Sequence, residues 1–464
     1  MTDSWAAFGA DLHLEPVGAG LRSGLTDALR EAVRTGRLTP GTRLPSSRTL
    51  AADLGVARNT VADAYAELVA EGWLTARQGS GTRVAERAAV AAPAARTPPS
   101  RQTRRPAHTL VPGSPDLSSF PRAEWLKAAR RALTAAPDES FGYADPQGRI
   151  ELRTVLAEYL ARARGVYADP GRIVICSGFV HGLTLMGKVL RRRRVREAAV
   201  ESYGLDIHRD LLAGTGLRTP CLPVDGLGAV TGELGGMPGV GAVLLTPAHQ
   251  FPTGVPLHPG RRTAVIDWAR SAEGMVLEDD YDGEFRYDRQ PVGALQALDP
   301  ERVVYLGTTS KSLAPALRLG WMVLPQGLVG EVNAAKGGTD WMSGVLDQLT
   351  LAEFIASGAY DRHVRSMRLR YRRRRDQLVE ALAERAPDFR VSGIAAGLHA
   401  VLELPEDTEQ AVVQAAAWQG LALEGLTRFR HPDAEGRDGL VIGYGSPSES
   451  GWAGALDALC RVLP

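Results

Sequence analysis

Cysteine is scarce in this sequence, and no long apolar run interrupts it. Three cysteines occur among 464 residues, at Cys176, Cys221 and Cys460. Their wide separation excludes a disulfide framework and a cysteine-based metal site, and it fits a reducing compartment. No run approaches the 18 apolar residues of a membrane span, and residues 1–10 lack the apolar core of a signal peptide. We therefore expect a cytoplasmic protein.

An excess of charge of one sign is also lacking, because 54 basic side chains face 53 acidic ones and the formal net charge is +1. Any contact with nucleic acid must therefore come from a local basic cluster. The hydrophobic content of 44% is typical of globular proteins. A chain of this length exceeds one ordinary core, so two or three domains are expected.

Residues 15–85 have the pattern of a small helical unit that ends in a hairpin. Apolar residues recur every four positions from Leu21 to Val33, which predicts a first helix. A second helix is expected after Ser46 or Ser47 as N-cap, with Gly55 at its C-terminal end. A third begins near residues 58–60, and a two-stranded wing follows. This order predicts a winged helix-turn-helix, a mainly α unit.

Three short stretches carry a family resemblance in this unit. Residues 38–48 read LTPGTRLPSSR, residues 56–61 read VARNTV and residues 79–82 read GSGT. Together they closely resemble the GntR DNA-binding family. The resemblance implies that Arg48 holds a phosphate, that the start of the third helix enters the major groove, and that wing glycines approach the minor groove. The implied DNA-binding residues are Arg43, Ser46, Arg48, Arg58, Asn59, Thr60, Gly79, Ser80 and Gly81.

The physical chemistry of these residues agrees with double-stranded DNA as a partner. Helix N-termini attract phosphate, and arginine binds guanine through two hydrogen bonds. Between residues 34 and 60, five arginines stand against one acid, Asp53. One departure from the family is Ala57, where Ser or Thr is usual, which removes a phosphate contact or N-cap. The alternative hypothesis is a winged helix that contacts protein rather than DNA.

Residues 86–112 are rich in alanine, proline and arginine and show no apolar period. Such a segment is typical of an extended, solvated linker. From residue 113 onward, apolar strand-like runs alternate with helical patterns, which predicts a mostly parallel, buried sheet. The expected strands are 172–176, 198–201, 240–245, 275–279, 302–306 and 319–324.

The end of the chain differs from this alternating pattern. Residues 342–383 are expected to form one long helix, and two strand-like runs follow at 398–404 and 440–445. We therefore expect a large α/β lobe at about 113–330 and a small C-terminal α+β lobe at about 385–464.

A lysine-bearing turn follows one of the expected strands. The apolar run 303–306 leads into glycine and a string of hydroxyls, then Lys311, with Arg318 seven residues later. A lysine fixed at the end of a strand suits Schiff-base formation with an aldehyde cofactor, and nearby hydroxyls and amides can hold a phosphate. The alternative is a solvated loop lysine.

Four further motifs accompany this turn, in the order SGFV at 177–180, ESYG at 201–204, TPAHQFPTG at 246–254 and EDDYDGEF at 278–285. With the lysine turn they resemble fold-type I enzymes that use pyridoxal 5'-phosphate (PLP), the aspartate aminotransferase class. Behind a GntR-type head, they make the whole chain similar to the MocR family of transcriptional regulators.

The resemblance implies a role for each matched residue. Lys311 would form the Schiff base with PLP, and Asp279 would pair with the protonated ring nitrogen. Tyr281 would reach the phenolate oxygen, with His249 or Gln250 at the same edge, while Tyr203 would stack on the ring. The implied phosphate ligands are Ser177, Gly178, Phe179, Ser310 and Arg318. Fold-type I sites lie at subunit interfaces, so a homodimer is also implied.

The carboxylate-binding arginine of aminotransferases has no clear counterpart here. It is expected near the strand at 439–445, which contains no arginine. Arg430 is the weak choice, with Arg428 and Arg437 as alternatives, and each is equally well explained as a solvated loop arginine. The arginine runs at 191–194 and 368–375 are interpreted as solvated helix faces.

Three functions remain open from the sequence. The favoured one is a DNA-binding regulator whose body senses PLP, or an amine or amino acid that exchanges with Lys311. The second is a working aminotransferase that carries a DNA-binding head. The third is a DNA-binding protein with a scaffold body, which the joint presence of Lys311, Asp279, Tyr281 and Arg318 argues against. Without a clear carboxylate arginine, a vitamin B6 sensor is preferred within the first.

Overall fold

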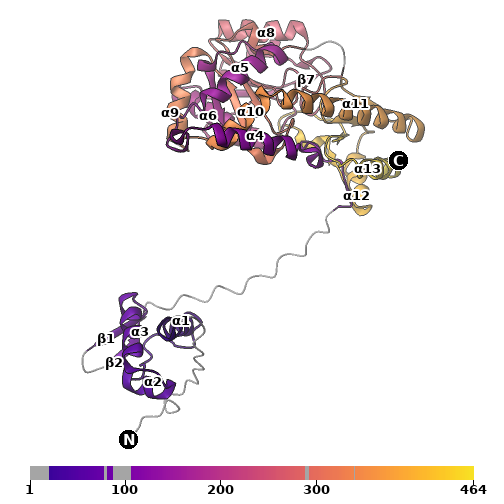
Figure 1. Ribbon diagram of the computed structural model, residues 1–464. Helices are drawn as coiled ribbons and strands as arrows, with labels where there is room; N and C mark the ends of the chain where they lie inside the picture. The colour runs from indigo at the N-terminus through magenta and orange to yellow at the C-terminus, as the bar shows by residue number, and fades with distance from the viewer. Residues whose placement is uncertain (1–19, 78–80, 87–105, 288–291, 339, 464) are drawn as a thin grey trace. The chain divides into compact units, whose positions relative to one another are not determined.

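The computed structural model describes residues 20–77, 81–86, 106–287, 292–338 and 340–463. The chain divides into two compact units, one up to residue 104 and one from residue 105 (Figure 1). The first is the head and the second the body, and each is described by itself. No helix within these ranges combines the length and the apolar character needed to span a membrane.

The head contains the three helices and the hairpin expected from the sequence. Its elements are α1 (Leu21–Arg34), α2 (Ser47–Leu54), α3 (Arg58–Ala70), β1 (Leu74–Arg77) and β2 (Gly81–Val84). The Ser46 hydroxyl accepts a hydrogen bond from the Thr49 amide at 3.1 Å and caps α2, which ends at Gly55 with φ of 65°. Leu29, Leu50 and Val61 are fully buried where the helices meet. The winged helix-turn-helix is confirmed.

A seven-stranded sheet forms the centre of the large lobe, in the order β4-β12-β11-β10-β9-β5-β6. Pairing is parallel except for β12, which runs antiparallel to both neighbours, so the expected mostly parallel sheet is confirmed. The short β6 was not expected. The strands are β4 (Ile173–Cys176), β5 (Glu197–Glu201), β6 (Cys221–Leu222), β9 (Val240–Leu245), β10 (Met275–Asp279), β11 (Val303–Thr308) and β12 (Gly320–Val323).

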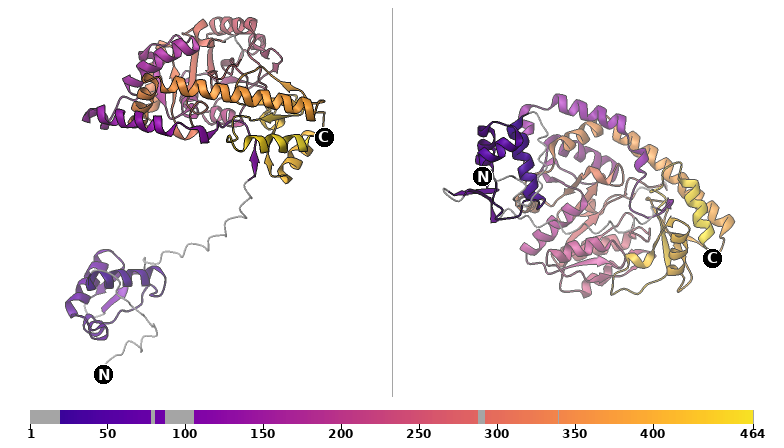
Figure 2. Two further views of the ribbon diagram at one scale, coloured as in Figure 1. Left: turned by 45° about the vertical axis from the view of Figure 1, so that its right-hand side comes forward. Right: turned by 90° about the horizontal axis from the view of Figure 1, so that it is seen from below.

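Helices cover both faces of this sheet (Figure 2). One face packs against α6 (Phe179–Arg192), α7 (Asp206–Gly214) and α9 (Val329–Gly337). The other packs against α5 (Ile150–Arg164), α8 (Pro259–Ser271) and α10 (Val345–Ala356), with α4 (Arg122–Ala135) lying on α10. Burial on both faces explains why the strand sequences are continuous apolar runs. A small hairpin, β7 (Val224–Asp225) with β8 (Gly228–Ala229), lies outside the sheet.

The single long helix expected at 342–383 is two helices. Helix α10 ends at Ala356 and α11 (Ala359–Arg385) begins after Gly358, whose φ of 68° is left-handed. Left-handed backbone ends an α-helix, and the apolar pattern on either side gave no sign of it. Helix α11 then runs from the large lobe to the small one (Figure 1).

The small lobe is an α+β unit, as expected. Its antiparallel sheet has the order β13-β14-β17-β16, with strands β13 (Val391–Ser392), β14 (Ala400–Glu403), β16 (Glu424–Gly425) and β17 (Gly439–Ile442). Helices α12 (Glu409–Trp418) and α13 (Trp452–Val462) pack on it with α11. A separate parallel pair joins β15 (Leu421–Ala422) to β3 (His108–Thr109), so the first strand of the body is attached to the small lobe.

Candidate cofactor and DNA-binding sites

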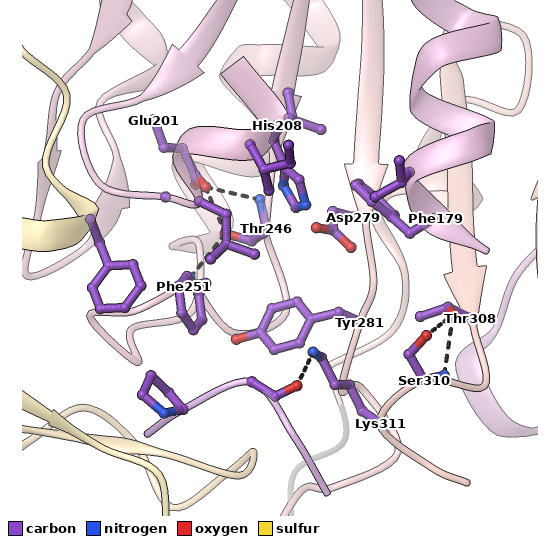
Figure 3. Close-up of a pocket in the computed structure, with 18 of the residues that line it drawn as sticks. Phe179, Glu201, His208, Thr246, Phe251, Asp279, Tyr281, Thr308, Ser310 and Lys311 are labelled. Atoms are coloured by element: carbon purple, nitrogen blue, oxygen red, sulfur yellow. Dashed lines mark hydrogen bonds between the residues drawn. The ribbon is translucent and has the colours of Figure 1, made fainter. Parts of the chain in front are cut away.

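A pocket of about 300 Å³ lies at the carboxyl ends of β5, β9, β10 and β11 (Figure 3). Open sheets of this type place ligands at this edge, because loops and helix N-termini converge there. The small lobe supplies the remaining wall through Leu398, His399 and Phe429. Of the predicted cofactor residues, those that line the pocket are Phe179, Tyr203, Asp279, Tyr281, Ser310, Lys311 and Arg318.

Asp279 is the last residue of β10 and points into the pocket (Figure 3). Its side chain is buried, and its Oδ1 atom has no hydrogen-bond partner among the described residues. Burial raises the pKa of Asp279 well above its ordinary value, while the charge of Lys311 acts in the opposite direction. A buried carboxylate oxygen without a partner fits a ligand that brings a protonated nitrogen, as the ring of PLP does.

Lys311 lies in the turn after β11, with its ammonium directed toward the same space (Figure 3). The Nζ atom donates a hydrogen bond to the backbone carbonyl of Gly113. Burial lowers the pKa of Lys311, opposed by the carboxylates of Asp279 and Asp282. A lowered amine pKa increases the share of neutral amine, the form that attacks an aldehyde carbon.

The predicted phosphate ligands lie together at the N-terminus of α6. Arg318 has left-handed φ of 54°, and its Nη2 atom donates to the Ser177 carbonyl at 2.6 Å. Gly178, with φ of 85°, precedes the helix, and a Cβ atom there would lie 3.1 Å from Arg318 Nη1. The helix amides and the guanidinium fit a phosphate, and only glycine leaves room for both. Ser310 adds a hydroxyl, 2.9 Å from that of Thr308.

The expectation that His249 or Gln250 lies at the ring edge stays a prediction, and neither side chain is part of the pocket wall. The Gln250 amide donates to the Tyr203 carbonyl at 2.8 Å and accepts from the Thr253 amide at 3.1 Å, so it holds its own turn together. His249 lies behind Tyr281, whose hydroxyl donates to the His249 carbonyl at 2.9 Å. Tyr281 itself is on the wall.

Tyr203 forms another part of the wall, at the boundary between the lobes. Its ring packs with Phe251 and Phe429, and its hydroxyl accepts a hydrogen bond from the Arg437 amide at 3.4 Å. Tyr203 also lines the pocket, where an aromatic ring can pack against a flat ligand. A stacking role for Tyr203 stays a prediction.

The predicted DNA-binding residues of the head lie on its surface. Arg48 in the first turn of α2 is exposed, as are Arg58 and Asn59 at the start of α3, while Thr60 is half-buried. The exposed Arg43 guanidinium lies against the wing, 3.2 Å from where a Cβ of Gly81 would be. Gly79 and Ser80 lie outside the described residues. Free guanidinium groups at helix N-termini are the groups that contact phosphates and guanine edges.

Comparison with known families divides the chain in the same way. Residues 21–84 match the family described as bacterial regulatory proteins, gntR family, and residues 113–437 match aminotransferase class I and II. Kynurenine aminotransferase from Pyrococcus horikoshii, solved in complex with PMP, has a similar body. It has a TM-score of 0.69 and 25% identity, covering 78% of this chain and 91% of that one.

Relatives that match along most of the chain are named as regulators. The HTH-type pyridoxine biosynthesis transcriptional regulator PdxR of Corynebacterium glutamicum is 34% identical over 92% of each chain. The probable rhizopine catabolism regulatory protein MocR of Rhizobium meliloti is 31% identical, over 90% of this chain and 89% of that one. The chain belongs to the MocR-type transcriptional regulators.

In this MocR-type chain, none of the three arginines considered for an effector carboxylate lines the pocket. Arg430 lies against Gly436 in the loop before β17, so the weak choice of Arg430 is not supported by its position. Arg428 pairs with Asp206 at 2.6 Å, and Arg437 pairs with Glu403 at 2.8 Å. Arg428 and Arg437 are therefore already paired with carboxylates outside the pocket.

Sequence reasoning missed several residues of the MocR-type pocket. Burial raises the pKa of Glu201 to about 7, and its carboxyl accepts from the Thr246 hydroxyl at 2.6 Å. His208 stacks obliquely on Phe179 at 4.7 Å, and burial followed by the charge of Lys311 lowers the pKa of His208 to about 4. Two of them had a usable signal, since Glu201 opens the ESYG motif and Thr308 belongs to the hydroxyl string that precedes Lys311.

Proposed function

We propose that this MocR-type regulator binds double-stranded operator DNA in the cytoplasm through its head and senses PLP through its body. Lys311 would form a Schiff base with the PLP aldehyde, and Arg318 and the α6 N-terminus would hold its phosphate. The observation that carries the proposal is the unpaired Oδ1 atom of buried Asp279 in the pocket that Lys311 also lines. A body that served only as a scaffold would need neither the unpaired carboxylate oxygen nor the lysine in the same pocket.

The small-lobe wall of the pocket favours PLP itself over an amino acid as the effector. On the small-lobe side the described lining consists of Leu398, His399 and Phe429, none of them a fixed cation. Burial lowers the pKa of His399 well below its ordinary value, so it is neutral at physiological pH. An α-carboxylate directed to this wall would be buried without a partner. The relative named as a pyridoxine biosynthesis regulator supports this choice.

A sensor of this kind requires that PLP favours one conformation of the regulator over another. A ligand with equal affinity for both conformations would change nothing at the DNA. Coupling between two sites is typically about 1–3 kcal/mol, which is roughly 5- to 150-fold in affinity. This range defines the size of the effect to look for.

We further propose that the body forms a homodimer, which would present two heads to two half-sites on DNA. Large apolar side chains are exposed on α4, at Leu126 (62%) and Leu133 (54%), and nearby on the Tyr143–Trp341 ring pair. Tyr143 is 92% exposed and Trp341 56%. Large exposed apolar side chains are common on a surface that is covered by another protein chain. Sedimentation of the purified protein tests this directly.

The function is tested by fluorescence anisotropy of labelled DNA from the gene's own upstream region, titrated with the full-length apo protein. PLP is then added at fixed, stated salt, because DNA affinity depends strongly on salt. We expect PLP alone to change the dissociation constant about fivefold or more. An unchanged constant would reject PLP as the effector.

The aminotransferase alternative has its own readout. Holo protein is mixed with a panel of amino acids, and loss of the PLP absorbance with formation of keto acid is followed. Steady turnover without any effect on DNA binding would favour the enzyme. We expect at most a single, slow half-reaction.

A further inference from the structure

Lys311 is bound to a backbone segment that leads to the linker. Its Nζ atom donates to the carbonyl of Gly113, a residue in left-handed backbone with φ of 99°. Gly113 belongs to residues 106–116, here named the leading segment. Residues 106–112 were expected to be the end of a solvated linker, but they are part of the body, since β3 pairs with β15 and Leu110 is fully buried. The lysine predicted to react with the cofactor therefore also holds the chain that carries the head.

The leading segment is fastened on both sides of Gly113. Before it, the His108 amide donates to the Gly420 carbonyl at 3.0 Å and the Leu110 amide to the Ala422 carbonyl at 2.9 Å, both in the small lobe. After it, the Asp116 amide donates to the hydroxyl of Tyr371 on α11 at 3.0 Å. At Gly113 itself, the Lys311 ammonium is the only hydrogen-bond partner of the carbonyl within the described part of the chain.

We propose that Lys311 signals the arrival of PLP by releasing the Gly113 carbonyl, and that the leading segment transmits this change to the linker. This proposal rests on the proposed function. When the neutral amine condenses with the aldehyde, a C=N bond forms, the C=O bond breaks, and two N–H hydrogens leave with the oxygen as water. The ammonium gives its third proton to solvent before this step, so the nitrogen keeps at most one N–H, and only if it is protonated again; it is now fixed to the cofactor carbon. Gly113 loses its partner.

The hydrogen bond between Lys311 and Gly113 determines which chemical class of ligand can act as the effector. A ligand that fills the ring and phosphate contacts but has no aldehyde leaves the Lys311 ammonium intact, and with it the bond to Gly113. Occupancy of the pocket is then not sufficient as a signal. The effector must be a phosphorylated pyridine aldehyde that condenses with Lys311.

The first test compares PLP with 4-deoxypyridoxine 5'-phosphate, which has a methyl group in place of the aldehyde. Wild-type protein is saturated with each, and backbone hydrogen exchange of residues 106–116 is measured along with DNA affinity. We expect faster exchange in the leading segment and a change of about fivefold or more in the DNA dissociation constant with PLP only. Equal effects of the two ligands would overturn the proposal.

The second test changes Lys311. Lys311→Met removes the donor, so the cofactor-free variant should show the exchange rates and DNA affinity of PLP-loaded wild type. Lys311→Arg keeps a cationic donor that cannot condense, so it should stay in the cofactor-free state at any PLP concentration. The proposal fails if cofactor-free Lys311→Met and cofactor-free wild type agree in both measurements.

The chain offers a matched control in Lys336, another buried lysine that donates to a backbone carbonyl, that of Pro146, at 2.6 Å. Lys336→Met should leave the PLP response of both measurements unchanged. If it abolishes the response as Lys311→Met does, general damage to the body explains the loss and the specific contact is rejected. If PLP alters exchange in the leading segment but not DNA affinity, the contact is upheld and the regulatory function fails separately.

Discussion

Arg164 and Asp280 form a two-point ion pair beneath the cofactor pocket. The Nε–Oδ2 distance is 2.6 Å and the Nη2–Oδ1 distance is 3.0 Å, and the two side chains are 3% and 2% exposed. Tyr305 on β11 adds a hydrogen bond to Asp280 Oδ2 at 2.8 Å. The pair thereby ties the C-terminal end of α5 to the end of β10, next to Asp279.

Breaking this pair is expected to destabilise the body. Arg164→Met leaves the Asp280 carboxylate buried without its cation, which typically costs about 3–5 kcal/mol. Urea unfolding followed by tryptophan fluorescence measures the loss. The control is Arg162→Met on the same helix, which removes an exposed 2.7 Å pair with Asp361 and should cost no more than about 1 kcal/mol. Equal losses would mean that burial does not decide the effect.

The stability of the body is expected to fall as the pH rises from about 4.5 to 7, partly through Glu284. Burial, with the added charge of Asp280, raises the pKa of Glu284 from 4.5 to about 7. In this window the unfolded chain binds fewer protons than the folded one, so a rise in pH favours unfolding. Glu284→Gln keeps the acceptor oxygen toward Tyr159 and Tyr360 but does not titrate.

The measurement is the urea midpoint of wild type and Glu284→Gln at pH 4.5, 6 and 8. The variant should recover up to about 3 kcal/mol of the wild-type loss between the extremes, because one pKa unit corresponds to about 1.4 kcal/mol. Parallel curves for the two proteins would show that Glu284 ionises normally. Burial also raises the pKa values of Glu201 and Glu278 to about 7. The stability of the variant should therefore still fall with pH, but less steeply than that of wild type.

Asp279→Asn should weaken PLP binding by about 10- to 100-fold. The substitution removes the negative charge from the unpaired oxygen, and a charge-assisted hydrogen bond contributes about 1.5–3 kcal/mol. Spectroscopic titration of the apo variant with PLP measures the affinity. Glu278→Gln on the opposite face of β10 is the control, since its carboxyl accepts from the Leu295 and Gln296 amides instead. It should lower stability while PLP affinity stays within a few-fold of wild type.

Two arginines of the head should differ in how they contribute to DNA binding. Arg58→Ala should cost about 1–3 kcal/mol on the operator and much less on unrelated DNA, because a base contact is lost. Arg48→Ala should weaken both DNAs and reduce the salt slope by about 1, as expected for a phosphate contact. Arg34→Ala, which removes an exposed pair with Glu31 on α1, should change neither. Anisotropy at several salt concentrations separates the three patterns.

Strand positions in the body could be predicted from sequence because burial on both faces leaves unbroken apolar runs. Strands β9 and β10 have the expected bounds, while β11 begins one residue and ends two residues later than expected. Since the carboxyl ends of neighbouring parallel strands meet at one edge, the strand assignment already placed Asp279 near Lys311. The elements of the head could also be predicted, because its helix caps and turns contain residues that strongly favour those positions.

The direction of side chains within turns could not be predicted from the sequence. Gln250 and Tyr281 follow strands in similar polar turns, yet Tyr281 reaches the pocket and Gln250 bonds its own backbone. The break at Gly358 was missed because apolar spacing continues across it. The bond from Lys311 to Gly113 joins residues 198 positions apart, and no local pattern records such a contact.

The pairing of β3 with β15 also has a consequence for how the protein is made. The two strands are separated by about 310 residues, which the ribosome adds in roughly 15–60 s at ~5–20 residues/s. The head, whose elements all lie before residue 85, emerges and folds long before β15 exists. During synthesis, each molecule therefore has a folded head before β3 can pair with β15. The body can bind its ligand only when synthesis is nearly complete.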